Sequence, residues 1–151
     1  QLVWFKRDLR TFDHAPLAEA AARGPVLPLY VAEPDYWALP DTSGRQWEAI
    51  ADGLHELRED LARLGQPLVV RTGDAVGVLE RLRESHGIAA LWSHEETGNT
   101  WTYDRDRRVA RWCREQGVAE VGERSELSTR SPASTRRRPP SSSSAATALL
   151  K

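Results

Sequence analysis

Charged and polar side chains gather in two short stretches of this 151-residue sequence, and each stretch directly follows an apolar run. The first is Lys6–Arg10 (KRDLR), after Leu2–Phe5, and the second is Ser93–Asn99 (SHEETGN), after Ile88–Trp92. Arginine side chains donate paired hydrogen bonds to carboxylate or phosphate oxygens, and carboxylates accept hydrogen bonds from N–H groups. The two stretches could therefore bind a polar ligand, provided that the fold brings them together.

Motifs for several common chemistries are missing from the sequence. No G-x-G-x-x-G follows the first apolar run and no G-x-x-x-x-G-K-[ST] occurs, so the dinucleotide fingerprint and the P-loop are both absent. No set of Cys and His residues has zinc-site spacing, and no G-x-S-x-G nucleophile motif is present. Glu95 and Glu96 are adjacent and point apart, which makes them a poor acid–base pair.

Five short apolar runs alternate with amphipathic stretches along residues 1–123. Apolar runs of this length predict strands, and apolar positions spaced by three and four predict helices. This alternation indicates a parallel sheet covered on both faces, and right-handed crossovers favour a doubly wound, Rossmann-like α/β fold. The expected strands are Leu2–Phe5, Val26–Val31 (with Pro28 unusual for an interior strand), Pro67–Arg71, Ile88–Trp92 and Val118–Val121.

The helices between these strands have recognisable ends. Ser43 and Gln46 have capping-box spacing, and the helix that follows should run to about Leu64. Asp13 and Asp74 are the expected N-caps of two others, and a further helix is expected from about Thr100 to Gln116. The long helix carries one apolar stripe that we expect to be buried, made of Trp47, Ile50, Ala51, Leu54, Leu57, Leu61 and Leu64.

A doubly wound sheet binds its ligands beyond the carboxyl ends of the strands, where the strand order reverses. The first and fourth strands usually flank this point. We therefore expect the polar stretches after these two strands, Lys6–Arg10 and Ser93–Asn99, to meet at one edge of the sheet.

Length and composition predict one ordered domain in a reducing compartment. The chain is 40% hydrophobic and 28% charged, with no run long enough for a membrane span and no signal peptide at its start. The single cysteine, Cys113, cannot form an internal disulfide, which favours a cytoplasmic protein. Because the sequence contains no Met and starts at Gln1, we interpret it either as a fragment or as a gene product given without its natural start.

Residues 124–151 differ in composition from the rest of the chain. This segment is rich in Ser, Arg and Pro, has no aromatic residue, and carries six basic residues against one acid. Such a composition predicts a disordered tail. A nucleic-acid-binding role and a shifted reading frame are the alternative explanations of this basic, patternless string.

The opening of the sequence resembles the DNA photolyase/cryptochrome family. LVWFKRDLRTFDHAPLAEA at residues 2–20 matches the strand, the [FW]-[RK]-R-D-L-R signature and the D-[NH]-x-[AP]-L that open these proteins. VLPLYVAEP (26–34), SGRQW (43–47) and ALWSHEETGNTWTYDRDRRVARWCREQGV (90–118) fit the same family, and HEETG is similar to the corresponding segment of DASH-type cryptochromes. The resemblance covers roughly residues 1–121.

The resemblance implies a blue-light flavoprotein with two parts. Its N-terminal α/β domain, here residues 1–123, would carry an antenna chromophore, either a folate or a deazaflavin or other flavin. A helical C-terminal domain would hold FAD and the damaged DNA, and light-driven electron transfer from reduced FAD would repair pyrimidine dimers, as in a deoxyribodipyrimidine photo-lyase. The chain ends before that domain, so we expect the antenna half alone, without catalytic activity.

Under this resemblance, eight residues are candidates for contact with the antenna chromophore. Basic residues would donate to its carbonyl or phosphate oxygens, and a glutamate would accept from a pterin ring. The alternatives are structural: ion pairs that fix the loops or dock the helical domain, solvated acids, a packing role for His94, and a solvated helix face for Arg105 and Arg108. The candidates are Lys6, Arg7, Asp8, Arg10, His94, Glu95, Glu96 and Arg105.

The sequence contains six tryptophans, and the resemblance argues against an electron relay among them, because the relay tryptophans of this family belong to the helical domain. Trp37 and Trp101 lie at loop or helix-start positions and could pack on a ring or on the absent domain. Cys113 is expected to be a small buried group, and Asp13 and His14 to cap a helix. We expect a core position for Trp4, Trp47, Trp92 and Trp112.

Two further hypotheses remain open at this point. One is a stand-alone nucleotide- or flavin-binding module, which the lack of a Gly-rich phosphate loop near the fourth strand disfavours. The other is a non-functional remnant of a truncated gene. Uptake of a chromophore that absorbs near-UV to blue light would separate an intact antenna site from a remnant.

The expected loss of the helical domain generates a first prediction. A surface that normally contacts another domain becomes an exposed apolar patch and favours self-association. We therefore expect the purified chain to elute from a size-exclusion column ahead of a monomer. Elution as a clean, soluble monomer would contradict this expectation.

Overall fold

A five-stranded parallel sheet with helices on both faces forms the centre of the protein. The computed structural model describes residues 1–96 and 98–123, and the predicted tail lies outside this part. The strand order is β3-β2-β1-β4-β5, which confirms the doubly wound α/β fold. The elements are β1 (Leu2–Phe5), α1 (Ala15–Arg23), β2 (Leu27–Ala32), α2 (Pro34–Trp37), α3 (Gly44–Arg63), β3 (Val69–Thr72), α4 (Ala75–His86), β4 (Ala90–His94), α5 (Thr100–Gln116) and β5 (Ala119–Glu123).

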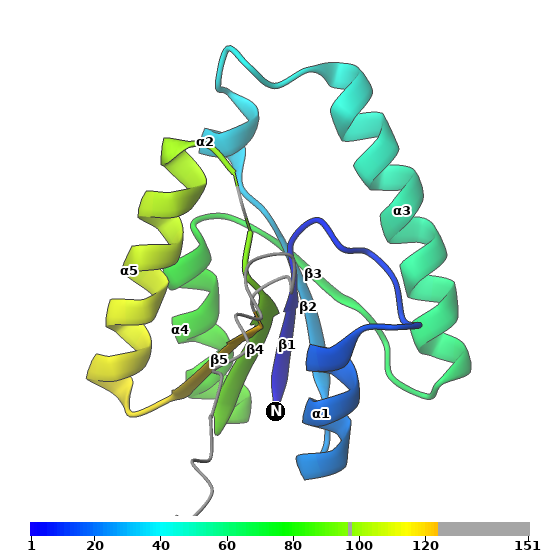
Figure 1. Ribbon diagram of the computed structural model, residues 1–151, viewed down its shortest axis with the longest axis vertical. Coiled ribbons are helices and arrows are strands. Elements are labelled where there is room, and N and C mark those ends of the chain that lie inside the picture. Colours follow the sequence, from blue (N-terminus) through cyan, green and yellow to red (C-terminus); the bar gives the residue numbers. More distant parts are fainter. Residues whose placement is uncertain (97, 124–151) are drawn as a thin grey trace, which may run out of the picture.

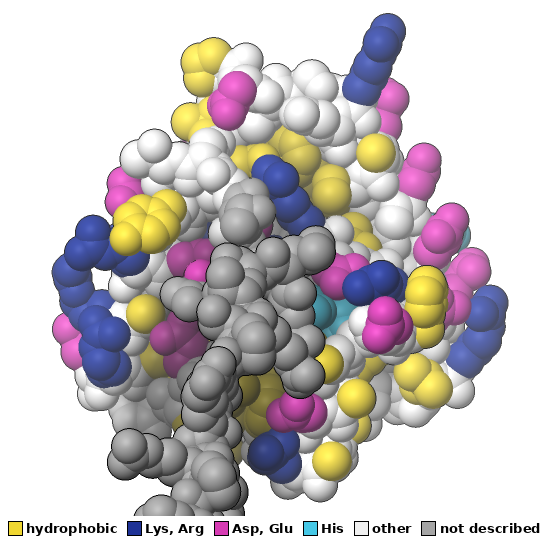
Figure 2. All heavy atoms as spheres, viewed as in Figure 1, with side chains coloured by type: hydrophobic (Ala, Val, Ile, Leu, Met, Phe, Trp, Pro, Cys, Tyr) yellow, Lys and Arg dark blue, Asp and Glu magenta, His cyan; other side chains and the backbone are white. Residues whose placement is uncertain are grey.

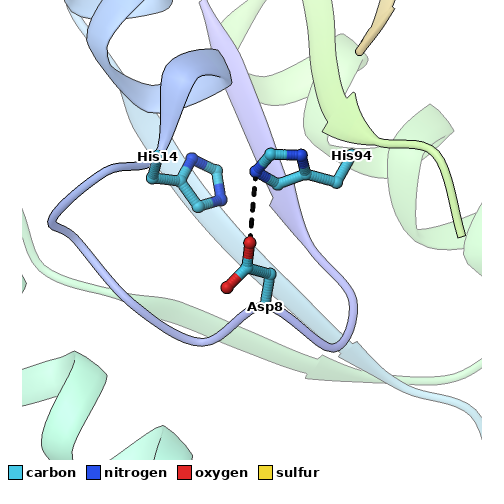
Figure 3. Close-up of side chains that lie close together, drawn as sticks. All are labelled: Asp8, His14 and His94. Atoms are coloured by element: carbon cyan, nitrogen blue, oxygen red, sulfur yellow. Dashed lines mark ion pairs between the residues drawn. The ribbon is translucent and has the colours of Figure 1, made fainter. Parts of the chain in front are cut away.

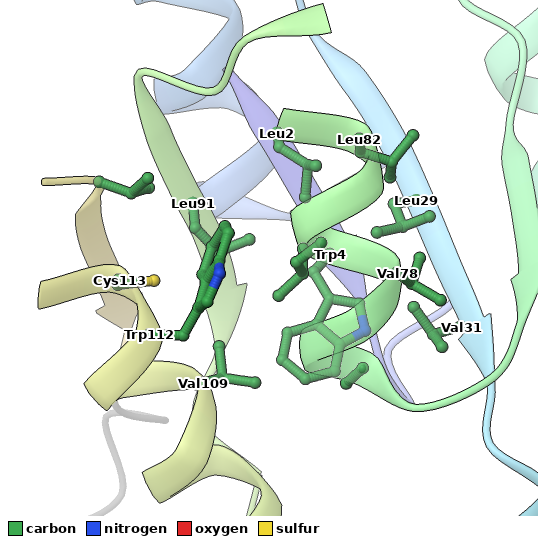
Figure 4. Packing of buried hydrophobic residues seen from close by; sticks show 13 residues of the cluster. Leu2, Trp4, Leu29, Val31, Val78, Leu82, Leu91, Val109, Trp112 and Cys113 are labelled. Atoms are coloured by element: carbon green, nitrogen blue, oxygen red, sulfur yellow. The ribbon is translucent and has the colours of Figure 1, made fainter. Parts of the chain in front are cut away.

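Alternate residues of β1 point to opposite faces of the sheet and belong to two separate cores. Leu2 and Trp4 pack with α4 and α5 (Figure 4), and Val3 and Phe5 pack with α1 and α3. Figure 1 shows these two helix layers on either side of the central strands. Since all four side chains are at most 3% exposed, β1 is buried on both faces, as a central parallel strand should be.

Pro28 fits into β2 because of where it lies in the strand. Leu27 N–H donates to the Gln1 carbonyl (2.8 Å), so the nitrogen of the next residue faces away from β1, toward β3. Pairing with β3 begins only at Leu29, while Pro28 is the register partner of Val3 on the other side. The missing N–H of proline therefore removes no hydrogen bond from the sheet.

The helix starts confirm most of the predicted caps and correct one. Ser43 and Gln46 form the capping box, and the Asp74 carboxylate accepts from the Gly77 N–H. The first helix is capped by His14, not by Asp13. Asp13 instead has φ 47°, a left-handed conformation that turns the chain before the helix.

The apolar stripe of α3 is buried only in its C-terminal half, which corrects the predicted core. Leu57 and Leu61 are at most 1% exposed, whereas Trp47 is 39% and Leu64 66% exposed. Figure 1 shows that the first turns of α3 rise beyond the ends of the strands, so only Ile50 of these turns packs against the core, and it is only partly buried. Spacing alone cannot reveal this, because it does not report the length of the sheet.

This difference along α3 predicts two unequal effects of the same substitution. Leu57→Ala should lower the free energy of unfolding by about 2–5 kcal/mol, because it leaves a cavity in the core. Leu64→Ala, in an exposed side chain just beyond the helix, should change it by less than about 0.5 kcal/mol. Urea unfolding followed by circular dichroism measures both, and equal effects would contradict the packing described.

Candidate functional site

A cavity of about 620 Å³ opens between the carboxyl ends of β1 and β2 and the N-terminal half of α3. It lies beside β1, where the strand order reverses between the β2 and β4 sides. Figure 2 shows apolar side chains in the hollowed upper part of the molecule, near acidic and basic ones. The offset of α3 from the sheet creates this space, at the position where doubly wound folds bind ligands.

Arg105, on α5, connects the walls of this cavity. Its Nη1 donates to Glu33 Oε2, its Nη2 to Glu96 Oε2 (both 2.7 Å), and its Nε to Asp106 Oδ1 (3.1 Å). The guanidinium carbon lies 4.9 Å from the centroid of the Trp4 ring. Burial alone would lower the pKa of Arg105, but the surrounding carboxylates, Glu33 first, outweigh burial and raise it.

This burial corrects the expectation of a solvated helix face at Arg105, which is 5% exposed. Arg108, one turn later, does lie on the outside and pairs with Asp74 (2.8 Å). Periodicity could not distinguish the two arginines, because Glu33 is 72 residues away in the sequence.

The cationic and acidic loops meet over the cavity, as the doubly wound topology predicts. Arg7 Nε lies 2.8 Å from Glu96 Oε1, and Arg7 also donates to the Tyr36 hydroxyl (3.0 Å). Both Glu96 oxygens therefore lie in ion pairs with guanidinium groups: Oε1 with Arg7, and Oε2 with Arg105, which also donates a hydrogen bond to it. The loop after β1 is thereby fixed to the loop after β4.

Lys6 lies beside these pairs and contacts Asp106 (3.2 Å) and the face of the Trp4 ring (4.5 Å). Burial lowers the pKa of its ammonium group, with Asp106 acting in the opposite direction. Asp8 and Arg10 form a further pair at 2.8 Å. The charged groups around the cavity are thus mostly neutralised by one another.

Glu33 lines the cavity and carries a buried carboxylate oxygen that is unpaired among the described residues. It is 5% exposed and lies directly after β2, and its Oε1 has no hydrogen-bond partner among the described residues. Burial raises the pKa of this carboxyl group, and the neighbouring Arg105 opposes the rise. Burial also raises the pKa of the nearby Tyr30 hydroxyl to about 12, so this group stays neutral. A buried acceptor without a donor points to a missing hydrogen-bonding partner.

Aromatic rings form a connected series at the cavity. Tyr36 and Trp37 from α2 contact each other (5.1 Å between centroids), Trp37 contacts Trp47 of α3 (5.1 Å), and Tyr36 contacts Trp101 of α5 (5.4 Å). Tyr36 and Trp37 line the cavity directly. Trp47, expected in the core, instead belongs to this partly exposed series.

Of the eight predicted site residues, six line the cavity: Lys6, Arg7, Asp8, Arg10, Glu96 and Arg105. His94 and Glu95 instead line a neighbouring hollow of about 250 Å³, together with His14. The sequence reasoning missed Glu33, Tyr36 and the placement of His14. The position of Glu33 directly after the second strand was the available signal for the first of them.

The fold and the cavity define a Rossmann-like α/β domain with a ligand-type site at its switch point. The family model for DNA photolyase matches residues 1–137, which is most of the chain. The chain belongs to the DNA photolyase family. This confirms the resemblance to that family and favours a photolyase-like N-terminal domain over a stand-alone nucleotide-binding module.

Individual relatives agree with the family model. Cryptochrome DASH of Arabidopsis thaliana is 27% identical over 133 residues, covering 83% of this chain and 22% of the relative. The deoxyribodipyrimidine photo-lyase of Escherichia coli is 44% identical over 75 residues, covering 48% and 16%. The crystal structure of a class III photolyase from Agrobacterium tumefaciens matches with a TM-score of 0.72 at 25% identity, covering 82% of this chain and 25% of that one. The chain thus spans about a fifth of the cryptochrome and less than that of the Escherichia coli photo-lyase.

Membership in this family implies binding of a flavin or antenna chromophore in general.

Among the described residues, no helix is both long and apolar enough to cross a membrane.

The buried ion pairs predict a large difference between two arginines of α5. Arg105→Ala leaves Glu33 and Glu96 buried without their shared partner and should cost about 3–5 kcal/mol of stability. Arg108→Ala removes an exposed pair with Asp74 and should cost less than about 1 kcal/mol. Urea unfolding at pH 7 provides the comparison, and similar losses for both variants would refute the role of Arg105.

The same variant has a pH signature. Burial raises the pKa of Glu33, and Arg105→Ala removes the cation that opposes this rise. A folded-state pKa above the unfolded value means that stability is lost as pH rises. The deficit of Arg105→Ala relative to the unaltered chain should therefore be larger at pH 8 than at pH 5, and a deficit independent of pH would contradict this assignment.

Proposed function

We propose that this domain binds a light-harvesting chromophore in the cavity between β1, β2 and α3. The observation that carries the proposal is a switch-point cavity with an unpaired buried acceptor, Glu33 Oε1, and an aromatic wall, in a chain of the DNA photolyase family. A structural relative supports it. The crystal structure of a photolyase from Sulfolobus tokodaii (TM-score 0.71, 25% identity) is described as having two FAD molecules and a novel light-harvesting cofactor.

The rings of the aromatic wall would pack against a planar chromophore. Tyr36 and Trp37 supply these faces, and offset or edge-to-face contacts stabilise such packing. Arg7 and Arg10 are partly exposed near the cavity and would donate to phosphate, carboxylate or carbonyl oxygens of the ligand. Lys6, Asp8, Glu96 and Arg105 hold the walls in place through the ion pairs described.

The carboxylate oxygens of Glu33 and Glu96 favour a flavin-type ring over a pterin as the ligand. A pterin presents two adjacent donors that match both oxygens of one carboxylate. Glu96 has both oxygens occupied by arginines, and Glu33 has only one oxygen unpaired. One unpaired acceptor fits a ring with a single N–H between carbonyl groups, as in flavins and deazaflavins. We therefore propose a flavin or deazaflavin rather than a folate.

His94 and Glu95 have a secondary place in this proposal. They line the neighbouring hollow and would contact only a part of the ligand that extends beyond the main cavity.

When bound, the chromophore absorbs near-UV to blue light and passes its excitation energy to FAD. The chain's own residues bind and orient the ring and exclude water from one of its faces. FAD binding and light-driven repair of pyrimidine dimers in damaged DNA would belong to a helical domain elsewhere in the whole protein. The described residues alone would not catalyse repair.

Ligand uptake by the purified chain tests the proposal. We expect FMN or a deazaflavin to co-elute with the protein and to quench its tryptophan fluorescence, with folate bound more weakly. Ile50→Trp would fill the cavity wall and should weaken flavin binding by at least about tenfold. Glu48→Trp, on an exposed position of the same helix, is the matched control and should bind normally. A chain that stays colourless with every chromophore would favour a non-functional remnant.

A further inference from the structure

Three potential metal ligands from distant parts of the sequence meet beside the β1 and β4 ends. Asp8 lies in the loop after β1, His14 caps α1, and His94 ends β4. One ligand atom of each lies within 4.8 Å of the others, and Figure 3 shows the three side chains pointing toward a common centre. His14 and His94 are 80 positions apart, so no motif in the sequence announces this cluster.

His94 and Asp8 lie at ion-pair distance but do not form a hydrogen bond. His94 Nε2 lies 3.3 Å from Asp8 Oδ2, yet this buried nitrogen has no hydrogen-bond partner of acceptable geometry among the described residues. The other Asp8 oxygen, Oδ1, is held by Arg10 Nε at 2.8 Å. This Arg10–Asp8 contact is an ion pair and not a hydrogen bond, since Arg10 Nε has no hydrogen-bond partner among the described residues; Asp8 Oδ2 is the oxygen that lies nearer His94.

His14 completes the cluster from the other side. Its Nδ1 accepts the Leu17 N–H at 3.1 Å, and its ring lies 4.5 Å from the ring of His94. The accepting Nδ1 places the proton of the neutral ring on Nε2, the atom directed toward the cluster (Figure 3). A metal ion bound at Nε2 would displace this proton to Nδ1, so the cap bond to Leu17 would be exchanged for the metal bond.

We propose that Asp8, His14 and His94 form a binding site for a divalent transition-metal ion. Two imidazole nitrogens and one carboxylate oxygen are ligands that zinc, iron, cobalt and nickel prefer, whereas magnesium and calcium prefer oxygen alone. The adjoining hollow of about 250 Å³ has room for water or a small anion as a further ligand.

This site shares Asp8 with the wall of the proposed chromophore cavity, but its two histidines lie outside that cavity. His14 and His94 line the smaller hollow and not the larger cavity. Metal binding could therefore fail while chromophore binding succeeds, or the reverse.

Cobalt titration of the metal-stripped full chain tests the proposal directly, because Co²⁺ bound by nitrogen and oxygen ligands has visible absorption bands. We expect one Co²⁺ per chain and displacement by Zn²⁺. His94→Ala and His14→Asn should each weaken binding by at least about tenfold. Asn is itself a good N-cap, so His14→Asn removes the imidazole and keeps the helix start.

The chain contains four histidines, and the other two provide matched controls. His55→Ala and His86→Ala remove exposed imidazoles outside the cluster and should leave Co²⁺ binding unchanged. If a cluster variant fails to fold, NMR of the unaltered chain still decides, since Co²⁺ should shift the imidazole signals of His14 and His94 and not those of His55 and His86. Absence of binding, or binding that depends on His55 or His86, would overturn the proposal.

Discussion

The burial of Arg105 between Glu33 and Glu96 is the interaction on which the candidate site depends. It joins the end of β2, the connection after β4 and the body of α5, and Arg7 extends it to the loop after β1. Charges removed from water are costly unless each is closely paired, so these segments have few alternative arrangements. The network therefore fixes the positions of the loops over the strand ends and keeps the cavity open.

A second constraint is the length of the sheet relative to α3. The C-terminal half of α3 packs on the sheet through Leu57 and Leu61, and its first turns continue past the strand ends. Apart from the partly buried Ile50, these turns do not pack into the core; together with Tyr36 and Trp37 from α2, they line the cavity. The loop after β1 still approaches α3 closely, because a Cβ on Gly53 would lie 3.1 Å from Leu9 Cδ1. The C-terminal half of α3 thus stabilises the core, and its N-terminal half forms a wall of the candidate ligand site.

The architecture was predictable from the sequence because its determinants are local. Apolar runs, the capping box at Ser43 and the glycine after α5 each act within a few residues, and the parallel topology follows from their alternation. The predictions were wrong or incomplete where residues far apart in the sequence determine the environment of a side chain. Only the folded chain brings together the residues around Arg105, Trp47 and the His14–His94 pair. Helical spacing therefore predicted the wrong environment for Arg105 and for Trp47. The spacing of known metal motifs did not reveal the His14–His94 pair.

The central claim is that the cavity beside β1 is the ligand site of this photolyase-family domain. Titration of the isotopically labelled chain with FMN, followed by two-dimensional NMR, tests it most directly. The account predicts that shifts concentrate at the backbone amides of Glu33 and Ile50 and at the indole N–H of Trp37. Shifts confined to another face, such as the outer surface of α4, or no shifts at saturating FMN, would contradict it.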